Sequence, residues 1–251
     1  MHENGLSAHG DSLVADHGWK TLYTIGSIGA MLVIPVGLLD VLLSFVPSGG
    51  TPQPGRGSAA EWYEIYRNTP FMALRGQGLL NMITLLSGMP VFAALYGAHR
   101  FRVRGLALLS MVLFFTGAAA YMVGNPALPL HSLSMRYATA PGETERLVIA
   151  AAGESLLAAG EDFSPGSFPA FFLINLSGLL MSVTLLNDNR FSKSTGNTGL
   201  IGFTCLIIHL TWVTFVSDPG ASSLALAVVG GLLSLLWYVM LSMKLFRIGR
   251  S

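Results

Sequence analysis

Charged side chains are scarce in this sequence of 251 residues. Asp, Glu, Lys and Arg make up 11% of it while hydrophobic residues make up 52%, and a typical soluble domain has about 25% charged residues. A chain of this composition has too little polar surface to face water on all sides. The shortage of charge therefore excludes an ordinary soluble protein. The net charge of +1 carries no sign of a nucleic-acid partner, and we expect none.

Cysteine and recognisable catalytic motifs are also missing. The single cysteine, Cys205, excludes a disulfide within the chain and leaves too few thiolates for a cysteine-based metal site. The first 20 residues lack the basic start of a cleavable signal peptide, because Glu3, Asp11 and Asp16 precede any Lys or Arg. We expect residues 1–20 to be a disordered cytoplasmic tail. No Gly-rich nucleotide loop, Walker motif or zincin helix occurs in the sequence, so no catalytic residue, metal ligand or cofactor is predicted.

Long apolar runs are present instead. Crossing roughly 30 Å of hydrocarbon takes about 20 helical residues, and six runs of about that length or more are free of Asp, Glu, Lys and Arg. They predict an all-α integral membrane protein. Its six transmembrane helices are expected at about 22–46, 76–98, 105–123, 167–187, 199–216 and 222–243.

The basic residues are distributed unevenly along the chain. Short links and ends that share one side of a six-span chain hold Lys20, Arg100, Arg102, Arg104, Arg190, Lys193, Lys244, Arg247 and Arg250. An excess of Lys and Arg in short loops marks the cytoplasmic side. We therefore expect both termini in the cytoplasm and loops 47–75, 124–166 and 217–221 outside. The transmembrane domain, residues 21–246, then forms three helical hairpins, and a short tail follows at 247–251.

Polar side chains within the spans are the first place to look for function, because burying them in lipid is costly. All but one lie toward the outer ends of their spans, and His209 lies near the middle of the fifth: Asp40, Arg75, Gln77, Asn81, Asn175 and His209. This one-sided polarity predicts an outward-facing binding pocket and not a pore, which needs polar residues at every depth. The alternatives are structural: an Asp40–Arg75 ion pair, and hydrogen bonds between helices from the other side chains.

The loop over residues 124–166 is too long and too apolar for a flexible linker. After the Asn125-Pro126 stop, Leu130, Leu133 and Tyr137 share one helical face, which suits a short helix in the membrane interface. Pro141-Gly142 breaks this helix, and "ETERLVIAAAGESLLAAGED" predicts a second.

Two side chains of this outer cap are candidates to reach the pocket. They are His131 on the first helix and Glu154 on the second, with Arg136 as a further possibility. The alternative leaves the glutamates of the second helix in water. Within loop 47–75, "PSGGTPQPGRGS" predicts a flexible segment. The following "AAEWYEIYRNTPF" predicts an amphipathic turn or two with Trp62, Tyr63 and Tyr66 as interfacial anchors.

About a third of the chain resembles a known group. "GNPALPLHSLSMRYATA", "ERLVIAAAGESLLAAGE", "SPGSFPAFFLINLSGLLMSVTLL" and "NRFSKSTGNTGLIG" are similar to uncharacterised bacterial membrane proteins collected under domain of unknown function 4386. The resemblance implies a bacterial, six-span protein of the cytoplasmic (inner) membrane. It assigns no catalytic residues.

These observations favour a non-enzymatic protein that binds a small or lipidic ligand, or a partner subunit, in the outward-facing pocket; a homo-oligomer is also open. One alternative is a metal-dependent hydrolase within the membrane, with ligands from Asp40, His131, Glu154 and His209. A small secondary transporter is another, with spans broken at Pro35, Gly37 and Pro90. Haem binding by His99 with His209 or His131 is the weakest, because no two histidines obviously face each other at matched depth.

Overall fold

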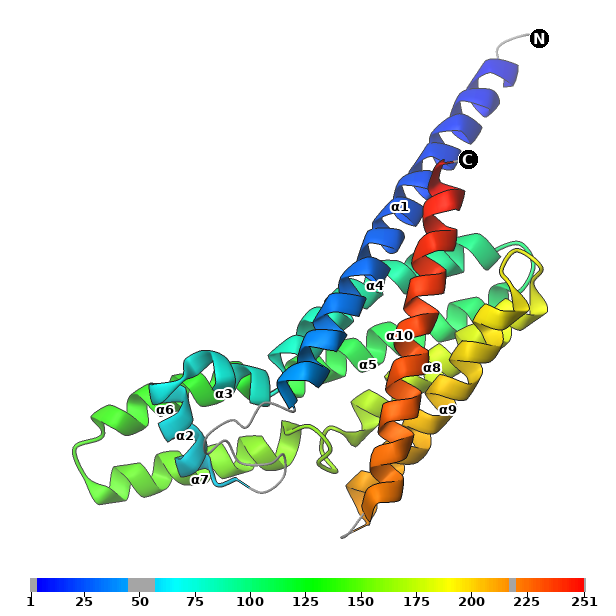
Figure 1. Cartoon of the computed structure of the whole chain (residues 1–251). Coiled ribbons are helices and arrows are strands. Elements are labelled where there is room, and N and C mark those ends of the chain that lie inside the picture. The colour runs from blue at the N-terminus through cyan, green and yellow to red at the C-terminus, as the bar shows by residue number, and fades with distance from the viewer. Residues whose placement is uncertain (1–3, 45–56, 217–219, 251) are drawn as a thin grey trace.

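The computed structural model describes residues 4–44, 57–216 and 220–250, which form helices and no strand. The ten helices are α1 (Asn4–Ser44), α2 (Ala59–Asn68), α3 (Pro70–Gly76), α4 (Leu79–His99), α5 (Arg104–Gly124), α6 (Ala127–Thr139), α7 (Glu143–Gly160), α8 (Phe168–Asn187), α9 (Lys193–Phe215) and α10 (Gly220–Arg250) (Figure 1). The flexible segment predicted at 47–58 lies almost entirely outside the described residues.

Six of these helices are long and apolar enough to cross a membrane, namely α1, α4, α5, α8, α9 and α10. We call them the bundle. The predicted all-α membrane fold is therefore confirmed. The largest difference is at the start: α1 begins at Asn4, so helical structure reaches well into the segment expected to be a tail. No proline interrupts that segment, which leaves the helix of the first span free to continue toward the N-terminus.

The bundle is a closed ring of helices. Each of its helices packs against the next along the chain, and α10 closes the ring by packing against α1. The predicted hairpins are the pairs α1–α4, α5–α8 and α9–α10, and the start of α1 and the end of α10 lie at the same end (Figure 1).

Aromatic side chains fill the middle of the ring. Phe92 of α4 stacks on Phe114 of α5 with ring centroids 4.1 Å apart, and Trp237 of α10 meets Phe203 of α9 edge-on at 5.1 Å. All four side chains are buried, Trp237 completely. Offset and edge-to-face pairs of this kind add to the energy of apolar burial. The bundle therefore has a packed centre, which fits the prediction of a pocket and not a pore.

The remaining helices, α2, α3, α6 and α7, form a second unit that we call the cap. It projects from one end of the bundle (Figure 1) and has its own apolar core, made of Ala59, Trp62, Tyr63, Tyr66, Ala73, Leu130, Ala140, Ile149 and Leu157. Both helices predicted in loop 124–166 are present, and the break at Pro141-Gly142 is confirmed. Leu130 is buried while Leu133 and Tyr137 pack on the same core, as their shared face predicts.

The interpretation of Trp62, Tyr63 and Tyr66 as interfacial anchors is wrong. Each is at most 2% exposed, because α6 and α7 supply a facing apolar surface. The Tyr63 hydroxyl donates to the carbonyl of Ile149 at 2.9 Å, and the Tyr66 hydroxyl to that of Ala127 at 2.8 Å. These aromatic residues therefore hold the cap together.

Candidate functional site at the junction of cap and bundle

Three helix breaks meet where the cap joins the bundle. The chain turns at Gln77–Gly78 between α3 and α4, at Asn125–Pro126 between α5 and α6, and at residues 161–167 between α7 and α8. Every break leaves backbone N–H and C=O groups without helical partners, and such groups must be satisfied internally where water is scarce. The polar side chains of this region supply much of that pairing. We call Gln77, Asn81, Tyr121, Asn125 and Asp162 the junction cluster.

Asn125 ties two of the breaks together. Its side-chain amide nitrogen donates to the carbonyl of Gln77 at 2.9 Å, and its amide oxygen accepts from the backbone N–H of Ala127 at 3.0 Å. The second bond holds the first turn of α6 directly after Pro126, which has no N–H of its own. Asn125 therefore fixes the α5–α6 break against the α3–α4 break.

Asp162 ties in the third break. The Tyr121 hydroxyl donates to its Oδ1 at 2.8 Å and the Asn81 amide to its Oδ2 at 2.7 Å, and the side chain is buried. Burial raises the pKa of Asp162 to about 6, the two hydrogen bonds oppose this, and the nearby carboxylates Asp40 and Glu161 raise it further. Both groups bonded to Asp162 are neutral. Its charge therefore changes near physiological pH.

Gly78 makes this geometry possible. Its φ of +88° lies in the left-handed region that glycine adopts at little cost. A Cβ added there would come within 2.0 Å of the Tyr121 hydroxyl. That hydroxyl also lies 3.4 Å from the Gly78 carbonyl. The turn between α3 and α4 therefore needs glycine for both its backbone conformation and its contact with Tyr121.

The predicted Asp40–Arg75 ion pair is confirmed. Arg75 Nε lies 3.5 Å from Asp40 Oδ1, and Arg75 Nη2 donates to the Asp40 carbonyl at 2.9 Å. This pair joins the end of α1 to α3, so it connects the bundle to the cap. Gln77 is 1% exposed, and its side-chain amide has no hydrogen-bond partner among the described residues.

The other predicted site residues lie elsewhere. Asn175 donates to the Phe171 carbonyl one turn back on α8, and His209 Nδ1 lies 2.9 Å from the Ser223 carbonyl of α10. His131 stacks on Tyr66 within the cap, with ring centroids 5.6 Å apart. Glu154 accepts from the backbone N–H of Ala59 at 2.7 Å and so caps α2. Of the predicted site residues, the structure places Asp40, Arg75, Gln77 and Asn81 together at the junction.

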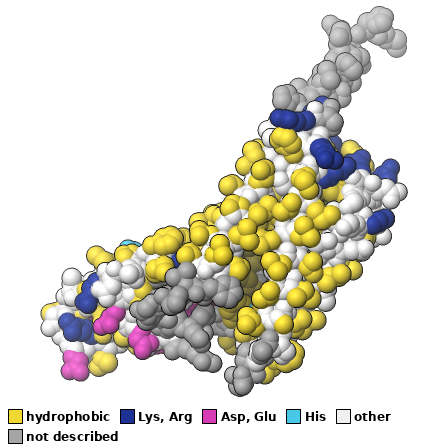
Figure 2. Space-filling model, viewed as in Figure 1, with side chains coloured by type: hydrophobic (Ala, Val, Ile, Leu, Met, Phe, Trp, Pro, Cys, Tyr) yellow, Lys and Arg dark blue, Asp and Glu magenta, His cyan; other side chains and the backbone are white. Residues whose placement is uncertain are grey.

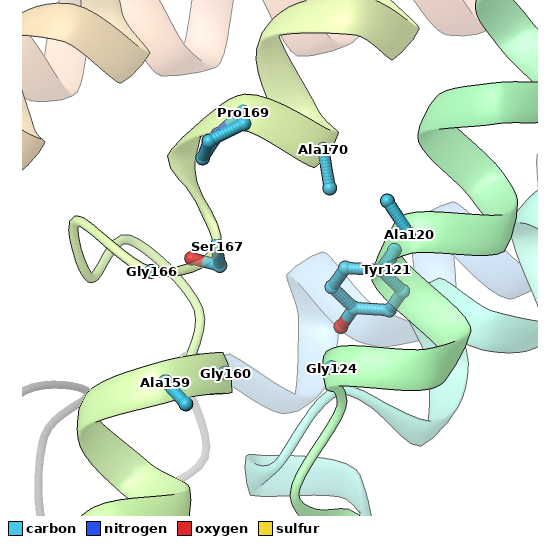
Figure 3. Close-up of a pocket in the computed structure, with 9 residues that line it drawn as sticks. All are labelled: Ala120, Tyr121, Gly124, Ala159, Gly160, Gly166, Ser167, Pro169 and Ala170. Carbon is cyan, nitrogen blue, oxygen red and sulfur yellow. The ribbon is translucent and has the colours of Figure 1, made fainter.

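A small groove opens beside the junction cluster. It has a volume of about 80 Å³ and is lined by Ala120, Tyr121, Gly124, Ala159, Gly160, Gly166, Ser167, Pro169 and Ala170. The α5 side chains Ala120 and Tyr121 face Ser167 and Ala170 across the gap (Figure 3). The Ser167 hydroxyl donates a hydrogen bond to the Glu161 carbonyl at 2.8 Å. The lining is more apolar than polar, and apart from Tyr121 it consists of small residues and Pro169.

Sequence reasoning missed Tyr121, Asn125 and Asp162 as parts of this site. Asn125 was interpreted only as a helix stop, and Tyr121 lies in an ordinary apolar run. Asp162 follows the second cap helix, where a carboxylate is expected to face water. The signal that could have found it is its position directly after a predicted helix and just before the Ser-Pro-Gly turn that leads into a span.

No protein-family model matches this chain, and neither does any curated protein or solved structure. The site is therefore interpreted from its own geometry.

Proposed function

We propose that this multi-pass membrane protein binds the alkyl part of a small lipid-like ligand in the groove at the junction of cap and bundle. The observation that carries the proposal is the position of the groove. It is mostly apolar and lies at the ends of the membrane-spanning helices α5 and α8, and Tyr121 of the junction cluster forms part of its lining. Pockets of this kind, with one or two polar groups beside apolar walls, are typical ligand sites between helices.

Size and lining select the ligand class. A volume of about 80 Å³ has room for roughly three water-sized groups, which suits the end of one alkyl chain. Gly160 packs directly against the Gly124 carbonyl, where a Cβ would clash, and both glycines contribute backbone to the lining of the groove. A polar headgroup would remain outside the groove, where the chain leaves the membrane.

Tyr121 connects the groove to the cap. Its ring lines the groove, while its hydroxyl donates to Asp162 and lies near the Gly78 carbonyl. Protonation of Asp162 turns one carboxyl oxygen into a donor, and the Tyr121 hydroxyl can then turn toward the Gly78 carbonyl. Ligand occupancy and the protonation of Asp162 would therefore act on the same side chain. This supports a binding protein whose cap position responds to its ligand.

The alternative chemistries find less support. No three His, Cys, Asp or Glu side chains among the described residues are grouped so that they could hold a metal ion. Asp40, His131, Glu154 and His209 each contact a different part of the molecule. We propose the bacterial cytoplasmic membrane as its location, with both termini in the cytoplasm. The Asn-Pro-Ala-Leu and Ala-Ala-Gly-Glu segments and the basic links support this.

The test adds a side chain at a residue that lines the groove. A Cβ at Gly124 meets no atom within 4 Å, so Gly124→Leu introduces a bulky side chain at this lining position without a backbone clash. The matched control is Gly105→Leu at the other end of α5, where a Cβ is equally free. Both proteins are purified in detergent and labelled with a photoactivatable fatty acid, and the labelled peptides are mapped by mass spectrometry.

We expect labelling of the native protein at residues 120–124 and 166–170. Gly124→Leu should reduce it about tenfold, equivalent to ~1.4 kcal/mol of lost binding, while Gly105→Leu should leave it unchanged. Equal labelling of all three proteins at these segments would contradict the proposal. So would labelling spread evenly over the lipid-facing helices.

A further inference from the structure

The end of the bundle opposite the cap is strongly basic. Blue Lys and Arg side chains gather there, whereas magenta Asp and Glu side chains appear on the cap (Figure 2). Among the acidic side chains that the structure describes, Asp188, in the link between α8 and α9, is the one at this end. Among the side chains that the structure describes, the basic end therefore has an excess of positive charge.

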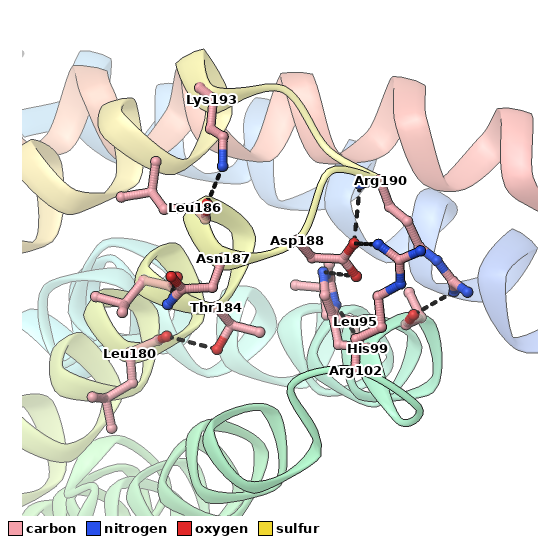
Figure 4. A network of polar contacts seen from close by, with 12 residues as sticks. Leu95, His99, Arg102, Leu180, Thr184, Leu186, Asn187, Asp188, Arg190 and Lys193 are labelled. Atoms are coloured by element: carbon pink, nitrogen blue, oxygen red, sulfur yellow. Dashed lines mark hydrogen bonds and ion pairs between the residues drawn. The ribbon is translucent and has the colours of Figure 1, made fainter.

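Asp188 is already committed to its neighbours. Its carboxylate lies 3.7 Å from His99 Nε2 and 3.6 Å from Arg102 Nη1, and it accepts from the backbone N–H of Arg190 at 3.2 Å. The Arg190 guanidinium in turn donates to the Ala98 carbonyl at 2.6 Å. Figure 4 shows these side chains converging between the α4–α5 and α8–α9 links. Asp188 is therefore engaged by Arg102 and the backbone of Arg190, and among the described residues no salt bridge joins it to Arg100.

Arg100 is held by aromatic rings. Its guanidinium carbon lies 4.0 Å from the ring centroid of Trp19 and 4.5 Å from that of Phe101. The Trp19 ring packs flat against α4 at Gly97, where a Cβ would come within 2.2 Å of the indole. Gly97 thus seats Trp19, and Trp19 supports Arg100. The aromatic contacts fix the guanidinium before any ligand arrives.

The guanidinium of Arg100 has an N–H donor that makes no hydrogen bond within the described residues. Arg100 Nη1 has no hydrogen-bond partner among the described residues although the atom is buried, a state that costs free energy unless a ligand completes it. A guanidinium stacked by its face keeps its N–H edge for a planar or tetrahedral anion, and phosphate oxygens match that edge in a bidentate manner. Arg100 therefore has the geometry of a phosphate-binding residue.

Phe101 indicates where the phosphate comes from. The side chain is 76% exposed and follows directly after a helix that is apolar enough to span a membrane. Exposed aromatic side chains at the end of a span lie among lipid headgroups. An anion held by Arg100 at this depth belongs to the membrane, and Phe101 would lie beside its acyl chains.

We propose that Arg100, Trp19 and Phe101 form a binding site for the phosphate of an anionic phospholipid at the basic end of the bundle. Clusters of Lys and Arg beside membrane spans bind anionic lipids. The cluster attracts anionic lipids in general, and the stacked guanidinium of Arg100 provides one defined binding position for a phosphate. The site is at the opposite end of α5 from the groove and does not depend on the function proposed for the groove.

The test measures retention of phosphatidylglycerol against phosphatidylcholine by native mass spectrometry of the full chain. The variants are Arg100→Gln, Arg100→Lys and the matched control Arg104→Gln, which removes the same charge at an exposed position, the first residue of α5. We expect Arg100→Gln to lower the affinity for phosphatidylglycerol about tenfold. Arg100→Lys should lower this affinity by a smaller factor, because lysine keeps the charge but not the planar edge. Arg104→Gln should change the affinity less than twofold.

Two results would overturn the proposal. Equal losses in Arg100→Gln and Arg104→Gln would mean that the basic end attracts lipids only through its overall charge. Displacement of the lipid by inorganic phosphate at equal concentration would mean that the site takes a free anion and not a phospholipid. A thermal melt in phosphatidylcholine alone shows that each variant is folded. The fatty-acid labelling at the groove should be the same in all of them.

Discussion

Asp162 and Asp188 are buried carboxylates at opposite ends of the bundle, and their partners differ. Asp162, at the cap end, is bonded to a tyrosine hydroxyl and an asparagine amide, which are neutral. Asp188, at the basic end, lies beside the guanidinium of Arg102 and the imidazole of His99. Burial raises the pKa of Asp162 to about 6, whereas Asp188 is tied to the links beside it through Arg102 and the backbone of Arg190. The cap end is thus suited to change, and the basic end to holding the links in place.

The strongest way to break the cap-end cluster is Gly78→Ala. The new methyl group would have to displace the Tyr121 hydroxyl and would place alanine in the left-handed region. The strain costs about 1–2 kcal/mol, and a lost buried hydrogen bond costs about 1–3 kcal/mol more. We expect the free energy of unfolding in mixed micelles to fall by about 3 kcal/mol.

The matched control for this substitution is Gly220→Ala. Gly220 also has a positive φ, +61°, but a Cβ there meets nothing within 4 Å. It should therefore cost only the strain of about 1–2 kcal/mol. Equal losses in the two variants would show that the contact of Gly78 with Tyr121 contributes nothing.

The protonation of Asp162 gives the next largest effect. In the unfolded chain its carboxyl ionises at the ordinary pKa of 3.8, while in the folded protein the pKa is about 6. Folding therefore favours the protonated form. This contribution to stability is fully present below pH 4 and is lost as the pH rises to about 6. Two pH units correspond to about 3 kcal/mol, at ~1.36 kcal/mol per unit.

The measurement compares the native protein with Asp162→Asn in unfolding titrations from pH 4 to 7. The stability of the native protein relative to this variant should decrease as the pH rises. Asp188→Asn removes the same charge at the other end and should keep the native pH dependence of Asp162. If the free energy of unfolding of the native protein and that of Asp162→Asn changed equally with pH over this range, Asp162 would not titrate there.

Asp188→Asn should have the smallest effect on stability itself. The Arg102 side chain is 61% exposed, so solvent screens much of its attraction to Asp188, and exposed pairs contribute about 0.2–1 kcal/mol. An asparagine keeps an oxygen that can accept from the backbone N–H of Arg190. We expect a loss of about 1 kcal/mol that becomes smaller with added salt. A loss that is unchanged at high salt would mean that the ion pair with Arg102 is not its source.

Local sequence patterns predicted much of the bundle and of the cap helices. The spans over 105–123 and 167–187 differ from α5 and α8 by one residue at an end or less, because charged residues or helix-breaking residues adjoin them. The break at Asn125-Pro126 and the helix at α7 followed from proline and from acidic residues in a first turn. The ion pair of Asp40 with Arg75 followed from their positions toward the outer ends of neighbouring spans.

The partners of the remaining polar residues could not be predicted in this way. Glu154 and Asp162 are acidic residues near the end of the same cap helix. One caps α2, and the other enters the junction cluster. Their roles depend on how α7 is rotated against α2 and α5. The sequence pattern of one segment does not predict that rotation. The aromatic residues of α2 were misplaced for the same reason, because their burial depends on α6 and α7.

By itself, the sequence determined that this chain has six membrane spans, an uneven distribution of basic residues and helix breaks at Asn125-Pro126 and Pro141-Gly142. These features follow from the thickness of the bilayer and from local backbone chemistry, which act on one segment at a time. Only the tertiary structure decided that three helix breaks meet, that Asp162 lies between Tyr121 and Asn81, and that Arg100 is stacked on Trp19. Those contacts join segments far apart in the chain, and they depend on how whole helices pack against one another.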